Sequence, residues 1–465
     1  MRGDAAMNRS ENTVRVDADL ATLRSQRSLP SLRSTSRAAS GARGRLSSAD
    51  RARRSRSTCK SVVAVCVVML AVLAVAETGS LSLDQVVRDA LSRNPRLVAL
   101  GTTRDAMLER PVQATSLPNP MFTYRGMDAT SGGAFPNTSE KRFEIEQPLP
   151  GYGKRGLREA VAVNEAGAMG AEAEVMAQEV ILMVKDAAYE LQAVQKSLLI
   201  TRTEDDLLSR MTKVAEVRYA AGEAAQVDAI KARTESTMLQ QKLVELEGRE
   251  KTLQAKLAFL MNRDADQAPV TILAPIPGGA VPDPVILVKL ALGKRAEIKG
   301  AQLKVDRSEL QRKLMTRESQ PDYKVGLEYR AIERQDDMVM FMVGVDLPLW
   351  RGKTRAAIRE AGMMASASEA DRMAMERQVT LDVQSACYKV ATARRTVELY
   401  QKELIPQAAV RLQSSEAGYR AGKVDFSDWL ESQRFGLTVR IMAVMAEGEL
   451  GSGWAALERA VGGSL

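Results

Sequence analysis

Two stretches of sequence decide the fold of this chain: RYAAGEAAQVDAIKAR at residues 218–233 and GYRAGKVDFSDWLESQ at residues 418–433. Four identities lie 200 positions apart, and they pair Tyr219 with Tyr419, Ala221 with Ala421, Gly222 with Gly422, and Asp228 with Asp428. In each stretch the glycine stands between two long segments of helical composition, where a chain can reverse between antiparallel helices. The sequence therefore predicts two helical hairpins of the same kind.

The segments that flank the first turn predict very long helices. No proline occurs from Lys154 to about Tyr219, and at about 1.5 Å per residue this stretch would form a helix of roughly 100 Å. The stretch from Asp228 to about Leu260 runs back with leucines at coiled-coil spacing, namely Leu239, Leu243, Leu246, Leu253 and Leu257. In the second copy, Pro406 predicts a kink or a break in the long helix. Because no globular core needs helices of this length, we expect them to pack in antiparallel pairs.

Each hairpin is preceded by two short segments that alternate like β-strands. Residues 322–330 and 338–347 alternate clearly in the second copy, and residues 121–127 and 141–150 correspond to them in the first. The apolar positions predicted to face lipid are Phe122, Tyr124, Phe143, Ile145, Tyr323, Val325, Leu327, Tyr329, Val339, Phe341 and Val343. Such strands suit a membrane barrel with lipid outside and water inside. They equally suit an ordinary hairpin on a soluble core, and the alternation alone leaves both interpretations open.

The paired segments extend through most of the chain. EQPLPGYGKRGLREA at residues 146–160 corresponds to VDLPLWRGKTRAAIREA at residues 345–361. Ahead of its strands each copy begins with a helix, and the Ser82/Asp84 region is expected to cap the first one. We therefore expect two internal repeats, at residues 81–265 and 284–465, joined by a Pro/Gly-rich linker at residues 266–283.

Residues 1–76 have the features of a secretory leader. RARRSRSTCK at residues 51–60 precedes an uncharged run from Ser61 to Ala76, which ends in the cleavage signal Ala74-x-Ala76. The run is short for a membrane helix, which needs roughly 20 apolar residues. We expect an Arg-rich n-region and a signal peptide cleaved after Ala76, with a retained anchor as the alternative. No later segment reads as a transmembrane helix, so membrane residence would have to come from strands.

The composition narrows the functional classes. The net charge is +8, but residues 1–76 hold 14 Lys and Arg against 5 Asp and Glu, which leaves 52 basic and 53 acidic residues downstream. We therefore expect no nucleic-acid partner. The chain has no histidine, and beyond the leader it has one cysteine, Cys387, which disfavours catalytic triads, zinc hydrolases, haem ligation and disulfides. We expect no enzyme activity, no cofactor and no metal site.

This ordered set of segments resembles the outer-membrane efflux proteins, the TolC-type channels of tripartite pumps. The resemblance covers residues 81–460 and rests on the twofold element order, on PLPGYGKRG and PLWRGKTRAAI at the strand-to-helix joins, and on two Tyr-x-x-Gly-x5-Asp turns. It implies a mainly α fold whose long antiparallel hairpins form an α-barrel, with four β-strands per chain in a trimeric 12-stranded membrane β-barrel. It also implies an outer-membrane location with a long periplasmic extension, and it places the linker in an equatorial region.

The resemblance assigns roles to residues near the two turns. Asp428 and Glu431 take the places of carboxylates that point into the periplasmic aperture, where threefold symmetry would make two acidic rings. Tyr419 and Asp228 take the places of a hydrogen-bonded pair that holds the hairpins shut, and Val424 stands where a basic latch residue is expected. The adaptor-docking tips would be Ala220, Ala221, Gly222, Ala421 and Gly422. From the residues alone, the carboxylates also suit a solvated helix face, and the tips also suit simple turns.

Other motifs give weaker indications of function. Met338, Met340 and Met342 alternate as a copper(I) track would, but methionine usually fills space, and we assign no metal site there. The glycine-lysine motifs are not a phosphate loop, because Leu347 stands where the first glycine is required. Four basic residues are expected where barrel and helices join, near lipid headgroups or in salt bridges: Lys154, Arg155, Lys353 and Arg355.

The sequence therefore predicts a passive homotrimeric exit channel for metal cations or small toxic compounds. It would couple to an inner-membrane pump through a periplasmic adaptor, and the joins favour the metal-cation and resistance-nodulation branch. The alternative from another class is a periplasmic coiled-coil interaction or adaptor protein without a barrel. What separates the two is whether the four alternating segments enter a membrane.

Overall fold

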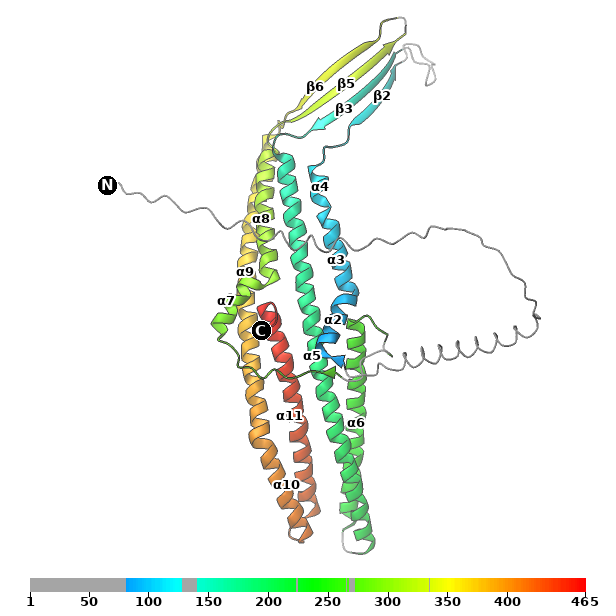
Figure 1. The fold of residues 1–465 in the computed structure, drawn as a ribbon, viewed down its shortest axis with the longest axis vertical. Coiled ribbons are helices and arrows are strands. Elements are labelled where there is room, and N and C mark those ends of the chain that lie inside the picture. Colours follow the sequence, from blue (N-terminus) through cyan, green and yellow to red (C-terminus); the bar gives the residue numbers. More distant parts are fainter. Residues whose placement is uncertain (1–80, 128–139, 223–224, 265, 267–271, 334) are drawn as a thin grey trace, which may run out of the picture. The chain divides into compact units, whose positions relative to one another are not determined.

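The computed structural model describes residues 81–127, 140–222, 225–264, 266, 272–333 and 335–465. The chain divides into the units Met1–Val75 and Ala76–Leu465, and every described residue belongs to the second unit. The predicted leader therefore lies outside the described residues. Within the second unit, four strands lie at one end of a set of long helices, and two helical turns lie at the other end (Figure 1).

The first helical segment begins where it was predicted but is divided into three helices, α2 (Leu83–Arg93), α3 (Pro95–Leu108) and α4 (Arg110–Thr115). The Ser82 hydroxyl accepts a hydrogen bond from the Gln85 amide, and the Gln85 side chain accepts one from the Ser82 amide, so the predicted cap is confirmed. The prediction of a single helix is wrong. Pro95 forces the preceding Asn94 into an extended conformation, which ends α2.

The first hairpin consists of α5 (Lys154–Ala220) and α6 (Gln226–Leu260), which pack against each other. Helix α5 runs for 67 residues without a break, as the absence of proline predicted. Along α6, Leu239, Leu246, Leu253 and Leu257 are buried and Leu243 is half-buried, which confirms the predicted coiled-coil spacing. Two short strands that the sequence analysis did not anticipate, β1 (Leu81–Ser82) and β4 (Ile272–Leu273), pair in parallel.

The second half begins with α7 (Pro284–Lys294) and α8 (Ala296–Arg317), and its hairpin contains α9 (Arg351–Leu399), η2 (Tyr400–Leu404), α10 (Ile405–Arg420) and α11 (Phe426–Val461). A kink or a break was predicted at Pro406, and the structure shows an irregular turn: α9 gives way to the single π-helical turn η2, and α10 continues from it with Pro406 in its first turn. Proline has no N–H to donate and its ring crowds the preceding turn, so the helix widens there.

All four predicted strand segments are strands: β2 (Met121–Met127), β3 (Glu140–Leu149), β5 (Asp322–Ile332) and β6 (Met338–Asp346). They form one antiparallel sheet in the order β2-β3-β5-β6. The register aligns the predicted apolar positions in rows across the sheet. One row contains Phe122, Ile145, Leu327 and Phe341, and the next contains Tyr124, Phe143, Tyr329 and Val339.

The alternate rows of the sheet are polar on β2, β3 and β5 and end in methionine on β6. They contain Thr123, Glu144, Glu328 and Met340 in one row, and Arg125, Arg142, Arg330 and Met338 in the next. Ion pairs cross these rows, for example between Arg125 Nη2 and Glu144 Oε2 at 3.1 Å. On the apolar side, Tyr124, Phe143 and Val325 are half-buried, and the other eight predicted lipid-facing residues are exposed. The sheet therefore has one apolar face, as predicted, and an opposite face that is charged along β2, β3 and β5 and carries methionine along β6.

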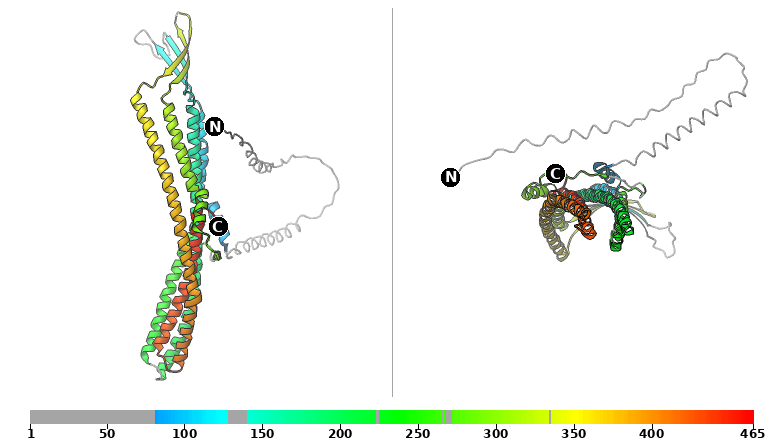
Figure 2. Two further views of the ribbon diagram at one scale, coloured as in Figure 1. Left: turned by 90° about the vertical axis from the view of Figure 1, so that its left-hand side faces the viewer. Right: turned by 90° about the horizontal axis from the view of Figure 1, so that it is seen from below.

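The hairpin helices lie side by side in a curved layer in the order α6, α5, α11 and α10 (Figure 2). Toward the sheet, α3 and α4 pack on α5, and α8 packs between α5 and α9. Buried apolar residues form three clusters along this layer, and the one nearest the turns joins both hairpins through Leu208, Leu239 and Trp429. In the described part of the chain, no helix is both long and apolar enough to cross a bilayer.

Candidate functional site at the hairpin turns

The two turns expose small residues. Gly222 and Gly422 adopt φ angles of +77° and +70°, a left-handed conformation that glycine adopts without strain. The five residues predicted as docking tips are all exposed: Ala220, Ala221, Gly222, Ala421 and Gly422. A partner can therefore approach the backbone of both turns closely, while docking itself stays a prediction.

Val424 closes the second turn by an apolar contact. The amides of Lys423 and Val424 both donate to the Gly418 carbonyl, at 2.9 and 3.3 Å. A Cβ atom at Gly418 would collide with Cγ2 of Val424 and lie 3.2 Å from its Cβ. Glycine at position 418 thus makes room for the Val424 side chain, and the position expected to hold a basic latch residue contributes packing instead.

Tyr419 contacts Arg218 of the first hairpin. Arg218 Nη1 donates to the Tyr419 hydroxyl at 3.1 Å, and its Cζ lies 5.6 Å from the ring centroid. The Tyr419 ring also stacks on Trp429 at 6.1 Å. Asp228 lies half-buried in the first turn of α6, and no hydrogen bond joins it to Tyr419 in the described part of this single chain. The predicted gate pair is therefore not formed within the chain, and its formation in an assembly stays a prediction.

Asp428 and Glu431 are both exposed on α11, one turn apart, but they have different surroundings. Arg411 Nη2 of α10 donates to Glu431 Oε1 at 2.9 Å, and Arg411 Cζ lies 5.0 Å from the Phe435 ring centroid. The Asp428 carboxylate has no ion pair with any described residue. The charge of Glu431 is therefore compensated within its own hairpin, whereas that of Asp428 is not.

Two arginines of α11 reach buried carboxylates of the first hairpin. Arg434 Nε donates to Glu235 Oε2 at 2.5 Å, and Arg440 Nη2 donates to Glu204 Oε2 at 2.6 Å. Both carboxylates are buried, and the hydrogen bond with Glu235 raises the pKa of Arg434. These pairs tie the second hairpin to the first. Sequence reasoning missed them because the partners lie 199 and 236 positions apart and no spacing rule relates them.

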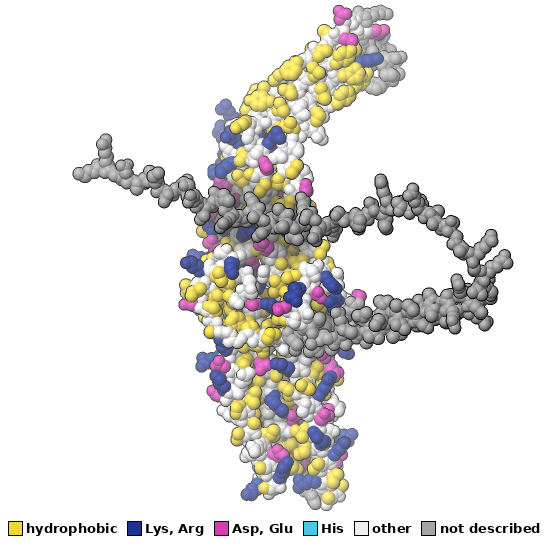
Figure 3. Space-filling view, in the orientation of Figure 1, with side chains coloured by type: hydrophobic (Ala, Val, Ile, Leu, Met, Phe, Trp, Pro, Cys, Tyr) yellow, Lys and Arg dark blue, Asp and Glu magenta, His cyan; other side chains and the backbone are white. Residues whose placement is uncertain are grey.

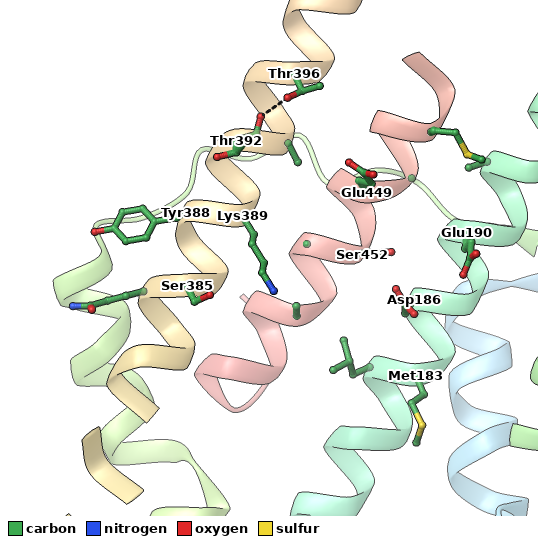
Figure 4. A pocket seen from close by; sticks show the side chains of 18 of the residues that line it. Met183, Asp186, Glu190, Ser385, Tyr388, Lys389, Thr392, Thr396, Glu449 and Ser452 are labelled. Carbon is green, nitrogen blue, oxygen red and sulfur yellow. Dashed lines mark hydrogen bonds between the residues drawn. The ribbon is translucent and has the colours of Figure 1, made fainter. Parts of the chain in front are cut away.

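A groove of about 1340 Å³ lies between α5, α9 and α11 (Figure 4). Asp186 and Glu190 of α5 face Lys389 of α9 across it, and Glu449 lies on α11 between them. Arg249 Nη2 of α6 donates to Glu190 Oε1 at 2.6 Å. Within the described residues, no group of three or more Asp, Glu, His or Cys side chains is arranged to hold a metal ion. The groove is therefore a polar surface of mixed charge.

The element order and the sequence agree with one family of proteins. A sequence model described as outer membrane efflux protein matches residues 86–263 and again residues 287–463. The chain belongs to the outer membrane efflux protein family. The resemblance inferred from the strand-to-helix joins and the paired turns is thereby confirmed.

Relatives of this outer membrane efflux protein include the cobalt-zinc-cadmium resistance protein CzcC of Cupriavidus metallidurans. It is 22% identical over 382 residues, which cover 79% of this chain and 87% of CzcC. The fold matches the outer-membrane channel OprN with a TM-score of 0.71 at 19% identity, over 82% of this chain and 90% of OprN. It also matches VceC of Vibrio cholerae with a TM-score of 0.69 at 16% identity, over 82% and 96% of the two chains.

Proposed function

We propose that this chain forms a homotrimeric outer-membrane exit channel of a tripartite efflux system. The observation that carries the proposal is the sheet, whose apolar side chains align in rows on one face while charges occupy the other. A soluble sheet normally covers its apolar face with another layer, yet Phe122, Phe341 and Val343 are exposed. An apolar face in lipid and a charged face in water suit both sets of side chains.

The edges of the sheet support association with further copies. Among the described residues, β2 pairs only with β3, and β6 pairs only with β5, so the sheet has two unpaired edges. In a bilayer such edges leave backbone groups without hydrogen bonds, and closing the barrel satisfies them. Four strands are too few, because small barrels need about eight. Three copies would supply a 12-stranded β-barrel, which the hairpins would continue across the periplasm as an α-barrel.

The two-repeat organisation belongs to the same proposal. Residues 81–265 and 284–465 would each supply two strands and one long hairpin, and residues 266–283 would join them in the equatorial region. The family model matches two corresponding segments, which supports these boundaries. Passive transport needs no catalytic group, and the chain would act through the geometry and charge of its pore.

The turns would form the periplasmic mouth. Asp428 would supply the main acidic ring, because none of the described residues forms an ion pair with it, and Glu431 would add less because Arg411 compensates it. Tyr419 and Asp228 would pair in the closed mouth. The exposed tips would meet a periplasmic adaptor, which links the channel to an inner-membrane pump. An uncompensated acidic ring favours cations over anions.

The cargo would be metal cations or small toxic compounds. The relative CzcC is named for cobalt, zinc and cadmium resistance, which supports metal cations as the first class to test. The corresponding experiment measures the sensitivity of a deletion strain to each of these metals, with and without this chain. Resistance restored by the wild-type chain and not by a variant that fails to assemble would support metal export.

Neighbouring residues of β6 offer a matched test of membrane insertion. Phe341→Arg places a charge on the apolar face, which costs about 2–4 kcal/mol at the midplane of a bilayer. Met340→Arg places the same charge on the opposite face, beside Glu328 in the register. We expect the wild type and Met340→Arg to form heat-modifiable trimers in the outer-membrane fraction, and Phe341→Arg to be lost from it.

Two outcomes would contradict the channel. Equal assembly of both arginine variants would show that the apolar face does not meet lipid. A wild-type chain that is monomeric and soluble without detergent would favour the alternative, a periplasmic coiled-coil interaction or adaptor protein without a membrane barrel.

A further inference from the structure

An exposed apolar and basic surface lies where β6 passes into α9. Leu349 and Trp350 lie in this connection, and their exposed fractions are 73% and 81%. The helix then begins with four exposed basic residues that have no ion pair within the described part of the chain: Arg351, Lys353, Arg355 and Arg359. We call these four residues the α9 basic cluster.

The corresponding join of the first half uses its basic residues internally. Lys154 is buried, and its Nζ donates to Asp322 Oδ1 at 2.8 Å. Arg158 Nη2 donates to Glu318 Oε1 at 2.8 Å, and Arg155 Nε donates to the last carbonyl of α4 at 2.6 Å. These contacts tie the start of α5 to β5, to the end of α8 and to α4. The α9 basic cluster makes no such contacts, so it does not repeat that structural role.

Helix α9 gains no stability from this charge. The N-terminal end of a helix carries partial positive charge, which disfavours cations, and the first turn of α9 has no acidic residue. Lys313 and Arg317 near the end of α8 add further positive charge, and Asp346 and Glu360 form no ion pair with the cluster. Figure 3 shows Lys and Arg side chains gathered where α8 and α9 meet the sheet. This surface therefore has a positive potential that the chain leaves unneutralised.

We propose that the α9 basic cluster, together with Leu349 and Trp350, binds the anionic headgroups of phospholipids at the surface of the bilayer. The inference rests on the proposed function, because it requires that β6 crosses the membrane. Tryptophan beside lysine and arginine is the composition found at membrane interfaces, where the ring lies at headgroup depth and the cations meet phosphate. Tryptophan and arginine are also enriched at protein interfaces, so what favours a lipid surface is the position beside β6, a proposed membrane strand.

The distances along the chain suit this position. Four residues separate the end of β6 at Asp346 from the start of α9 at Arg351. From Arg351 to Arg359 the helix rises about 12 Å. The headgroup region on each side of the hydrocarbon core is about 5–8 Å thick, and an anionic surface attracts charge over a further distance of about 8 Å. The four-residue connection takes up part of this distance, so Arg351 and Lys353 at the start of α9 would lie nearest the lipid phosphates and Arg359 furthest from them.

Trp350 provides a local reporter. Of the three tryptophans, Trp429 and Trp454 are buried, with exposed fractions of 2% and 6%. The experiment places the assembled protein in nanodiscs that contain equal amounts of phosphatidylglycerol and phosphatidylcholine, with bromine labels on only one of the two lipids. Quenching of Trp350 fluorescence by each labelled lipid then reports which headgroup is enriched beside it. We expect stronger quenching by the anionic lipid, and we expect salt to weaken the preference.

The charge variant is Arg351→Gln/Lys353→Gln/Arg355→Gln. Each cation near an anionic surface contributes roughly fivefold to the preference, so three removals should reduce it by roughly a hundredfold. The control, Arg377→Gln/Arg395→Gln/Lys251→Gln, removes the same charge at exposed positions elsewhere on the helices and should leave the preference unchanged. Trp350→Phe should remove the lipid-dependent part of the quenching.

Each outcome is decisive for one of the two proposals. Inserted trimers with equal quenching by both lipids, or with a preference that survives the charge variant, would overturn lipid binding and leave the channel standing. A charge variant that loses the trimer rather than the lipid preference would assign the cluster to a contact with a second copy. Failure of the wild type to insert would overturn both proposals.

Discussion

The contact between α5 and α11 gives a stability prediction for Gly451→Ala. A Cβ atom at Gly451 would lie 2.5 Å from Cγ and 2.7 Å from Cε1 of Tyr189. The ring has little room to retreat, because Tyr189 is 4% exposed and its hydroxyl donates to the Pro275 carbonyl at 3.2 Å. The added methyl group therefore forces the ring or the helix to move.

The expected change in the free energy of unfolding is the sum of two opposing contributions. Overpacking in a well-packed core costs about 1–3 kcal/mol, and replacing glycine with alanine inside a helix returns up to about 1 kcal/mol. We expect Gly451→Ala to be less stable than the wild type by up to about 2 kcal/mol. Gly436→Ala on the same helix is the control, since nothing lies within 4 Å of its added Cβ, and it should be more stable by up to about 1 kcal/mol.

Denaturant unfolding in detergent, followed by far-ultraviolet circular dichroism, compares the two variants with the wild type. The gain from replacing glycine cancels between them, so the difference in the free energy of unfolding should equal the overpacking cost of about 1–3 kcal/mol. Equal midpoints would refute the claim that the Tyr189 ring leaves no room for a Cβ atom at position 451. A Gly451→Ala variant more stable than the wild type would refute it as well.

Three further predictions concern charge. Burial raises the pKa of Glu297, whereas its contacts with Arg295 and Arg459 lower it, and the net pKa lies below the ordinary value of 4.5. The ion pairs of Glu297 therefore stabilise the fold above pH 4.5, and this contribution is lost as the pH falls through the lowered pKa. Glu297→Gln should cost about 1–3 kcal/mol at neutral pH and nothing in acid, as denaturation at both pH values would show. Burial raises the pKa of Tyr189 to about 12, so wild-type stability should fall between pH 10 and 12, whereas that of Tyr189→Phe should not. In planar bilayers, Asp428→Asn should weaken the block by multivalent cations more than Glu431→Gln does, because Glu431 is paired with Arg411. Equal effects of the two substitutions would contradict this difference.

Much of the fold could be predicted because its signals are local. The proline-free stretch that became α5, the helix irregularity at Pro406 and the turn at Gly422 each follow from backbone chemistry at single positions. The strands could be predicted because polar and apolar residues alternate over short stretches of sequence. In the sheet, the predicted apolar positions of neighbouring strands lie opposite one another. The single helix predicted ahead of the strands is wrong in both halves. In the first half Pro95 restricts Asn94 more strongly than the apolar spacing suggested, and in the second half α7 ends at Lys294 and α8 begins at Ala296, with Arg295 extended between them.

The ion pairs and hydrogen bonds around the predicted site could not be predicted from local sequence. Both carboxylates on α11 were predicted as equivalent, but whether a charge is compensated depends on Arg411, which the turn brings back from 20 positions earlier. Arg218 has no counterpart in the second hairpin, where Gly418 holds the equivalent position, so comparing the halves gives the only local hint of its role. Contacts between hairpins depend on which helix faces become neighbours, and that is a property of the assembled layer.

The two halves differ in the burial of their charged side chains and in the continuity of their long helices. In the first half, Lys154 is buried and paired with Asp322. The long helix α5 of this half runs without interruption. The second half leaves Trp350 and Asp428 exposed, and its long helix is interrupted by a π turn. Interruption lowers the resistance of a helix to bending. In the proposed channel, the second hairpin would therefore bend more easily near the mouth than the first.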